Sequence, residues 1–350
     1  MSTTTQPPAS APKNVNRIGL TMAEYKGADS TLCAGCGHDA VTAQIIRAFY
    51  EYGVDPYMVT KLSGIGCSSK TPAYFLSKSH GFNSVHGRMP AIGTGVLLAN
   101  KELTAIGVSG DGDTASIGMG QFVHLLRRNI PMIYIIENNG VYGLTKGQFS
   151  ATADQGSRAK TGALNELPAI DVCAMAIELG CNFVARSFAG DPKQMIALLK
   201  ASLGHKGTAL FDVISPCVTF NNHDGSTKSY KYAKDHEELL HEISYVPFFE
   251  QINVDYKEGE AEDVKLHDGS HIRLRKIDRQ YDPTNKGEAF TMLRKAHEAN
   301  EFLTGLIYIN EDKSDFITQL NTVDTPLAHL RQEDVQPSAE DLSKIMAELM

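Results

Sequence analysis

The chain lacks the sequence features of nucleic-acid-binding and membrane proteins. Its 350 residues carry 41 acidic and 33 basic side chains, a net charge of −8, so no basic field argues for nucleic acid. No apolar run approaches the roughly 20 residues that span a bilayer. Residues 1–13 lack the basic and then apolar layout of a signal peptide. We therefore expect a cytoplasmic protein that binds neither nucleic acid nor a membrane.

Cysteine is also scarce, and its distribution is informative. Among the six cysteines only Cys33 and Cys36 lie close together, and none follows Cys217. The paired knuckles favoured by zinc sites are therefore absent, and so is a second, ferredoxin-like cluster domain. No internal repeats or coiled-coil heptads stand out. In such a chain, cysteines indicate thiolate ligands or buried residues rather than disulfides.

What the chain does contain is an acidic glycine turn between two apolar runs. The runs 103–108 and 130–136 predict buried parallel strands, and 116–128 predicts the helix that connects them. Asp111 follows the first strand and Asn139 follows the second, at the sheet edge where such folds bind ligands. A carboxylate and an amide there suit Mg²⁺, and the flanking glycines suit a diphosphate. The alternative is a structural turn without a ligand.

This spacing resembles the thiamine diphosphate motif, in which Gly-Asp-Gly is followed after a fixed interval by Asn-Asn. The resemblance implies that Asp111 and Asn139 bind Mg²⁺, with the Val141 carbonyl as a third ligand. It also implies that the surrounding turn lines the diphosphate, through Gly110, Gly112 and Asp113.

Four of the cysteines lie in loops at the ends of predicted elements: Cys33, Cys36, Cys67 and Cys217. Four thiolates can bind structural zinc or a 4Fe–4S cluster. Single ligands arriving from distant loops favour the cluster, and an inert loop remains a third interpretation. Cys173 and Cys181 belong to an apolar helix (170–179) and its exit, so we expect them to be buried.

Six motifs occur in one order: Cys-x-x-Cys-Gly-His, Gly-Ile-Gly-Cys-Ser-Ser-Lys, His-Gly-Arg, Gly-Asp-Gly-Asp, Asn-Asn-Gly-Val-Tyr-Gly-Leu-Thr-Lys-Gly-Gln and Ser-Pro-Cys. Over about residues 20–300 this set resembles the β subunit of the 2-oxoacid:ferredoxin oxidoreductases. The resemblance implies that the four loop cysteines bind one 4Fe–4S cluster. Ala34 and Lys146 depart from the family pattern, which often has proline and glycine there.

The resemblance implies a thiamine diphosphate-dependent, CoA-linked oxidative decarboxylation whose electrons pass through the cluster to ferredoxin. The fuller match is to members that convert 2-oxoglutarate to succinyl-CoA, a reversible reaction in principle. The alternatives are pyruvate or broad 2-oxoacid specificity within the family. A non-redox thiamine diphosphate-dependent decarboxylase with a structural zinc site is a further alternative.

By the same resemblance, Lys70 and Leu144 line the substrate pocket, where Lys70 pairs with the distal carboxylate of 2-oxoglutarate. A solvated lysine is the alternative. Further cofactor contacts are implied for Ile65, Gly66, His86, Tyr142, Gly143, Leu144 and Thr145. We expect His38 to cap the helix that follows it. Arg88 either reaches an anionic substrate or partner, or anchors its loop by a buried ion pair.

The chain carries one diphosphate-type module and no convincing second copy. The glutamate that activates the cofactor is therefore expected on an α subunit, and the family implies an α2β2 assembly. We expect a doubly wound α/β fold with a mostly parallel sheet and a C-terminal extension. The predicted division is an arm (1–20), a cofactor domain (21–240) and an extension ending in a partner-contacting tail (241–350).

Further elements follow from the apolar pattern. Helices are expected over 39–50, 91–100, 192–203, 286–300 and 339–350, and strands over 57–62, 182–186 and 208–215. A hairpin is expected over 264–277, turning at Asp268-Gly269, and Thr284 or Asn285 should cap the helix after it. Residues 221–232 are predicted to form a loop, and the chain after Tyr308 a polar tail.

Overall fold

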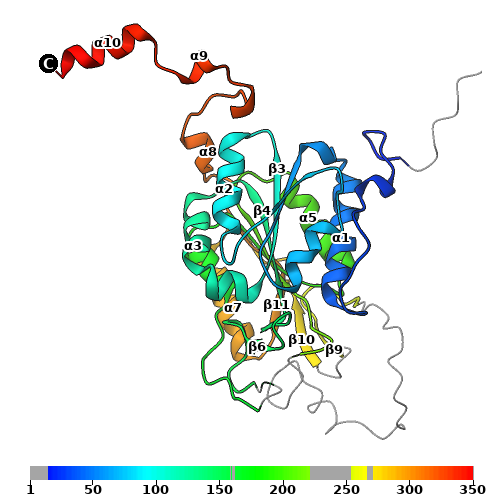
Figure 1. Ribbon diagram of the computed structural model, residues 1–350. Helices are drawn as coiled ribbons and strands as arrows, with labels where there is room; N and C mark the ends of the chain where they lie inside the picture. The colour runs from blue at the N-terminus through cyan, green and yellow to red at the C-terminus, as the bar shows by residue number, and fades with distance from the viewer. Residues whose placement is uncertain (1–14, 158, 160–161, 221–253, 266–270, 350) are drawn as a thin grey trace, which may run out of the picture.

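The apolar runs of the sequence form one nine-stranded, mostly parallel sheet. The computed structural model describes residues 15–157, 159, 162–220, 254–265 and 271–349. The strands lie in the order β2-β1-β3-β4-β8-β7-β11-β10-β9 (Figure 1). Their bounds are β1 Val59–Ser63, β2 His80–Asn83, β3 Thr104–Gly110, β4 Met132–Asn138, β7 Phe183–Phe188, β8 Ala209–Ile214, β9 Ala261–Lys265, β10 His271–Lys276 and β11 Phe302–Ile309. Only the pairs β7–β11 and β9–β10 of this sheet are antiparallel.

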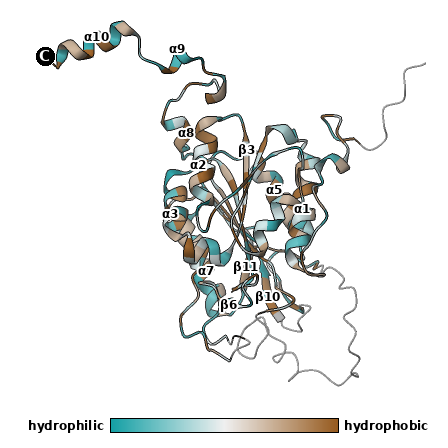
Figure 2. Cartoon of the chain, viewed as in Figure 1, coloured by the Kyte–Doolittle hydropathy of each residue, from teal (hydrophilic) through white to brown (hydrophobic). Residues whose placement is uncertain are grey.

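Helices cover both faces of this sheet, as a doubly wound fold requires. On one face α1 (Gly37–Tyr52) and α5 (Pro192–Leu203) pack on the strands. The other face carries α2 (Met89–Ala99), α3 (Met119–Arg128), α4 (Val172–Glu178) and α7 (Lys286–Glu298). The strands between the two layers are predominantly hydrophobic (Figure 2). The predicted fold class is confirmed.

Strand β4 shows how the pleat divides side chains between the two faces. Ile133 and Ile135 belong to the core under α1 and α5, whereas Tyr134 and Ile136 belong to the opposite core. Because side chains alternate along a strand, the next two residues, Glu137 and Asn138, face opposite sides of the sheet. This alternation assigns the two polar residues to different parts of the site.

The predicted helix 116–128 is present but interrupted. Asp113–Ile117 forms a short π-helical segment, closed by a hydrogen bond from the Gly118 N–H to the Asp113 carbonyl at 2.7 Å. The regular helix α3 begins only at Met119. Such π segments inside helices are frequent at functional sites.

The C-terminal part of the chain contributes strands that the sequence interpretation missed. β11 inserts between β7 and β10, although no strand was predicted over 302–309, and β2 is a short exposed edge strand that was also missed. The predicted hairpin is confirmed as β9 and β10, while its turn at Asp268-Gly269 lies outside the described residues. Asn285 caps α7, accepting a hydrogen bond from the Glu288 N–H. The boundary at residue 240 stays a prediction, since β9 to β11 extend the same sheet.

Beyond α8 (Phe316–Gln319) the chain leaves the body of the protein. Residues 320–349 form a C-terminal arm that carries η5 (Leu327–His329), α9 (Gln332–Val335) and α10 (Ala339–Glu348) away from the sheet (Figure 1). Exposed apolar residues of the arm include Leu342, Ile345, Met346 and Leu349. None of the helices in the described ranges is long and apolar enough to cross a membrane. The predicted loop 221–232 and residues 1–14 of the N-terminal arm fall outside these ranges.

Candidate functional site

A cavity of about 300 Å³ opens where the loops after β1, β3 and β4 meet. These strands are neighbours in the sheet and run parallel, so their carboxyl ends lie at one edge. All the residues predicted to contact the cofactor line this cavity: Ile65, Gly66, His86, Gly110, Asp111, Gly112, Asp113, Asn139, Val141, Tyr142, Gly143, Leu144 and Thr145. The loop ligand Cys67 lines it as well. The structure thus brings residues from three loops to one place.

Asp111 is buried, and its carboxylate is oriented by hydroxyl groups. Ser150 and Thr152 both donate to Oδ2, the Thr152 bond measuring 2.6 Å. The Thr152 hydroxyl also lies 3.0 Å from Asn138 Oδ1, and the Asn138 amide donates to Asp212 Oδ1 at 2.9 Å. Outer partners of this kind fix the direction of a metal-binding carboxylate. Ser150 and Thr152 were not predicted, because they follow the motif across a separate hairpin.

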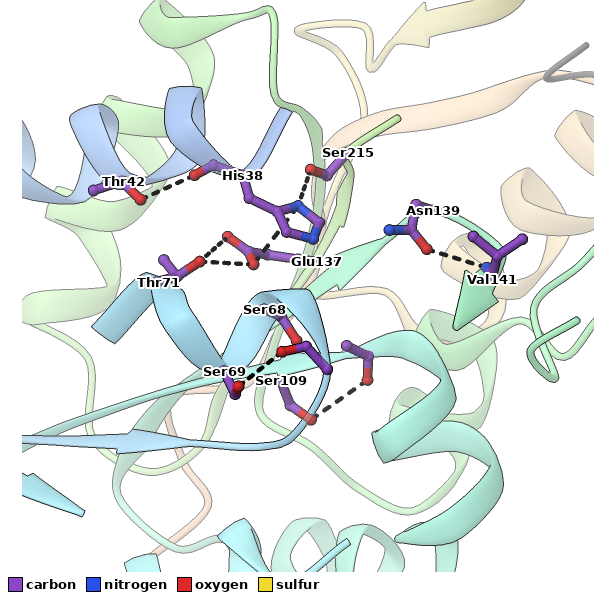
Figure 3. Close-up of polar contacts among 12 residues, drawn as sticks. His38, Thr42, Ser68, Ser69, Thr71, Ser109, Glu137, Asn139, Val141 and Ser215 are labelled. Carbon is purple, nitrogen blue, oxygen red and sulfur yellow. Dashed lines mark hydrogen bonds and ion pairs between the residues drawn. The ribbon is translucent and has the colours of Figure 1, made fainter. Parts of the chain in front are cut away.

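Asn139 begins the turn that leads into this hairpin, formed by β5 (Val141–Tyr142) and β6 (Gln148–Phe149). Its side-chain oxygen accepts the Val141 N–H at 3.1 Å (Figure 3). The predicted ligand set therefore offers one carboxylate, one amide oxygen and one backbone carbonyl, all hard donors of the kind that Mg²⁺ prefers. The chemistry of these donors fits a magnesium-held diphosphate.

Asp113 lines the cavity, but its carboxylate is directed at protein donors. Oδ1 accepts the Gly87 N–H at 2.7 Å, and Oδ2 accepts the Ser109 hydroxyl at 2.9 Å and the Ile65 N–H at 3.2 Å. A Cβ on Gly64 would lie 2.3 Å from Asp113 Oδ2, so this approach requires glycine. Asp113 thereby ties together the loops that carry Cys67 and His86.

The hairpin loop lies over the acidic turn. The Tyr142 hydroxyl donates to the Gly112 carbonyl at 3.0 Å, and burial raises the pKa of Tyr142. Leu144 at the loop tip is 55% exposed. Lys146 has a φ of 79°, a left-handed conformation that favours glycine, which explains why family members often carry glycine there.

The four loop cysteines converge behind this hairpin. A Cβ on Gly143 would lie 3.5 Å from Cys67 Sγ and 3.8 Å from Cys217 Sγ, and the Thr219 hydroxyl donates to Cys33 Sγ at 3.9 Å. Burial raises the pKa of the Cys67 thiol, and the nearby Cys217 and Cys33 add to the rise.

Cys36 behaves similarly. Its thiol pKa is raised by burial and, to a lesser extent, by Glu137 and Cys217. No three His, Cys, Asp or Glu side chains in the described ranges are already arranged around a metal position. The thiols are thus neighbours without closed ligand geometry. Cys173 and Cys181 are fully buried in the core, as predicted.

His38 does not cap α1, and that prediction is wrong. Cys36 occupies the N-cap position, and His38 turns inward, with Nδ1 2.6 Å from the Ser215 hydroxyl and 3.6 Å from Glu137 Oε2 (Figure 3). Burial lowers the pKa of His38 to about 4 and raises that of Glu137 well above its usual range. At neutral pH this contact therefore joins two uncharged groups. Glu137 lines the cavity and was not predicted, since a glutamate inside an apolar strand carries no motif.

The predicted cationic residues lie at the periphery. Arg88 is exposed and forms no ion pair within the described part of the chain, so the buried ion pair considered for it is wrong. Lys70 is half-buried, and its Nζ donates to the Thr31 hydroxyl at 3.4 Å. Lys70 is not among the described residues that line the cavity, whereas Leu144 is. The substrate role of Lys70 stays a prediction.

Two family models match this chain. Residues 64–213 match the family "Thiamine pyrophosphate enzyme, C-terminal TPP binding domain". Residues 271–325 match the family that describes the C-terminal part of the pyruvate ferredoxin oxidoreductase beta chain. The first match covers the strands and loops that form the cavity. The second covers β10, β11 and α8, which extend the sheet.

Curated relatives agree with these matches. The "2-oxoacid:ferredoxin oxidoreductase subunit beta" of a Sulfolobus species is 38% identical over 259 residues, 72% of this chain and 83% of the relative. The "2-oxoglutarate synthase subunit KorB" of Methanocaldococcus jannaschii is 37% identical over 54% of this chain and 69% of the relative.

A solved structure resembles the whole chain. It is the 2-oxoglutarate:ferredoxin oxidoreductase from Magnetococcus marinus with 2-oxoglutarate, coenzyme A and succinyl-CoA bound. The TM-score is 0.71 at 27% identity, and the match covers 95% of this chain and 96% of that one. With the cavity, the converging cysteines and these relatives in agreement, the chain belongs to the β subunits of the 2-oxoacid:ferredoxin oxidoreductases.

Proposed function

We propose that this β subunit acts on 2-oxoglutarate, with thiamine diphosphate, Mg²⁺ and one 4Fe–4S cluster as its cofactors. In the oxidative direction 2-oxoglutarate loses CO₂, its acyl carbon joins the sulfur of CoA as a thioester, and two electrons leave singly for ferredoxin. Thiamine diphosphate supplies the covalent chemistry when bound, and the protein supplies position and electrostatic field. The observation that carries the proposal is the meeting of the diphosphate motif and the cysteines across Gly143.

Asp111, Asn139 and the Val141 carbonyl would hold Mg²⁺, with Ser150 and Thr152 orienting Asp111. The thiols of Cys33, Cys36, Cys67 and Cys217 would bind the cluster. Their raised pKa values oppose free thiolates, so the charge of bound iron would be needed to deprotonate them. The hairpin between the two sets of ligands would keep the electron path short.

We further propose an α subunit as partner, assembled as α2β2 and supplying the glutamate that activates the cofactor. The exposed apolar residues of the C-terminal arm support a contact with a partner chain. The chain purified alone is expected to bind iron but not to consume 2-oxoacid. Turnover by the isolated chain would contradict this part of the proposal.

The cofactor assignment is tested by purifying the chain anaerobically together with its α subunit. A broad brown absorption that dithionite bleaches, with iron and acid-labile sulfide in the ratio of a 4Fe–4S cluster, is the expected result. Colourless protein that contains stoichiometric zinc would contradict it and favour the non-redox alternative.

Substrate preference is tested by Lys70→Ala in the same complex, with the exposed Lys193→Ala as the matched control. A hydrogen bond to a charged group contributes about 1.5–3 kcal/mol, so kcat/KM for 2-oxoglutarate should fall roughly 10-fold or more while that for pyruvate is nearly unchanged. If the two substrates were affected equally, Lys70 would not contact the distal carboxylate. Pyruvate or broad 2-oxoacid specificity would then be favoured.

A further inference from the structure

The buried Glu137 connects the segments that carry the predicted cluster ligands. It is the penultimate residue of β4, two positions before Asn139, and its side chain faces the side of the sheet covered by α1. The residue is 0% exposed. Burying a carboxyl group is costly unless hydrogen bonds compensate, so its contacts must account for its presence.

The first contact reaches the loop after β1. The Thr71 hydroxyl lies 3.0 Å from Glu137 Oε2 and 3.2 Å from Oε1, and it can donate to either oxygen. Thr71 belongs to the helical segment Cys67–Ala73, whose first residue is a predicted cluster ligand. The carboxyl group therefore holds this segment against the end of β4.

The second contact reaches two further ligand segments through one imidazole. His38 Nδ1 lies 3.6 Å from Glu137 Oε2 and 2.6 Å from the Ser215 hydroxyl (Figure 3). His38 follows Cys36 by two residues, and Ser215 precedes Cys217 by two. A backbone hydrogen bond from the Cys36 N–H to the Cys33 carbonyl at 3.0 Å extends the same connection to the fourth cysteine.

The start of α1 is pressed closely against the end of β8. A Cβ on Gly37 would lie 2.7 Å from the Ser215 hydroxyl and 3.1 Å from the Ser215 backbone. A side chain at this position would push apart the segments that carry Cys36 and Cys217. The imidazole therefore spans two segments already in close contact.

From these contacts we propose that Glu137 is a positioning residue for the iron–sulfur cluster. Its carboxyl group holds the three ligand-bearing segments in register with the strand that presents Asn139. This inference rests on the proposed function, because it assumes that the four cysteines bind the cluster. Its distinctive claim is that removing a group that is not a ligand loosens the iron. Since Glu137 also lines the cavity, the test must separate this role from direct participation in the reaction.

The experiment compares Glu137→Gln and Glu137→Leu with the unmodified complex of this chain and its α subunit. Iron and sulfide content, the electron paramagnetic resonance spectrum after dithionite and the rate of iron release to a chelator are measured. Outer partners of metal ligands typically change metal affinity about 10–100-fold, so Glu137→Leu should release iron faster by a factor in that range. Glu137→Gln keeps an acceptor for Thr71 and should retain most of the iron.

Thr71→Val provides a milder variant in case Glu137→Leu fails to fold. Its matched control is Thr94→Val, which removes a buried hydroxyl that bonds only within α2. Thr71→Val should accelerate iron release, and Thr94→Val should not. If both released iron at the unmodified rate, or if Glu137→Leu lost turnover with its iron unchanged, the inference would be wrong. Absence of iron from the unmodified complex would instead contradict the proposed function.

Discussion

The two walls of the cavity are built in opposite ways. The diphosphate wall, residues 110–113 and 139–145, comes from two consecutive strands of one βαβ unit. The thiol wall, the segments carrying Cys33, Cys36, Cys67 and Cys217 with His38 and Glu137, comes from regions far apart in the chain. Neighbouring strands place the first wall, whereas buried polar contacts between distant segments place the second.

The walls also differ in how complete they are without a ligand. On the diphosphate wall the oxygen donors are already oriented, Asp111 by two hydroxyls and Asn139 by the Val141 N–H. On the thiol wall the sulfurs are close, but no closed ligand set exists among the described residues. We infer that the diphosphate wall is preformed and that the thiol wall is completed by its cluster.

The largest expected effect comes from removing a thiol. Cys217→Ser should lower the iron content of the complex by about 10-fold or more, because a deprotonated sulfur ligand is lost. Affinity for thiamine diphosphate with Mg²⁺, measured by calorimetry, should change little if the walls are independent. Cys181→Ser, in the apolar core, is the control and should keep its iron. An equal loss of cofactor affinity in Cys217→Ser would show that the walls are coupled.

The reciprocal change is Asp111→Asn. Loss of the carboxylate should weaken binding of thiamine diphosphate with Mg²⁺ by about 100-fold, the upper end of what even outer-shell changes produce. Iron content should stay at the unmodified level. Iron loss comparable to that of Cys217→Ser would contradict the independence of the two walls.

A smaller effect is expected from Thr152→Val, which removes one of the hydroxyls that orient Asp111. The expected loss of affinity for Mg²⁺ with thiamine diphosphate is about 10-fold. The matched control is Thr291→Val, an exposed hydroxyl on α7 that bonds within its own helix. Unchanged affinity in Thr152→Val would show that Asp111 needs no support from the hairpin.

Asp113→Asn tests the contact between the two walls. An amide in place of the carboxylate would direct a donor at one of the N–H groups of Gly87 or Ile65. The lost hydrogen bond should cost about 1–3 kcal/mol of stability. Because Asp113 ties the Cys67 loop to the acidic turn, both iron release and cofactor affinity should change, unlike in the two single-wall variants. A change confined to one property would remove Asp113 from this connecting role.

The smallest effect concerns strain within the hairpin loop. Lys146→Gly should raise the free energy of unfolding by about 0.5–1 kcal/mol, because Lys146 holds a left-handed φ. Urea denaturation of the apo chain measures this, with Lys200→Gly on the exposed face of α5 as a control that should be destabilising. Destabilisation by Lys146→Gly would show that the lysine side chain compensates for its backbone strain.

Local pattern was sufficient where a feature depends on neighbouring residues. The strands around Asp111 and Asn139, α5 and the burial of Cys173 and Cys181 follow from apolar spacing. β11 was missed despite its apolar run, in which Gly305 and a bulge between Leu306 and Tyr308 break the regular pattern. β2 was missed because a short exposed edge strand carries no apolar alternation.

Sequence by itself determined the residue types of the site and their order along the chain, and with them the family resemblance. It placed Asp111 near Asn139, because consecutive parallel strands end at one edge of a sheet. Only the tertiary structure decided that His38 faces Glu137 rather than capping its helix, and that Ser150 and Thr152 orient Asp111. The physical reason is that a buried polar side chain takes whichever partner packing brings near it. That partner can lie more than a hundred residues away, as Ser215 does from His38.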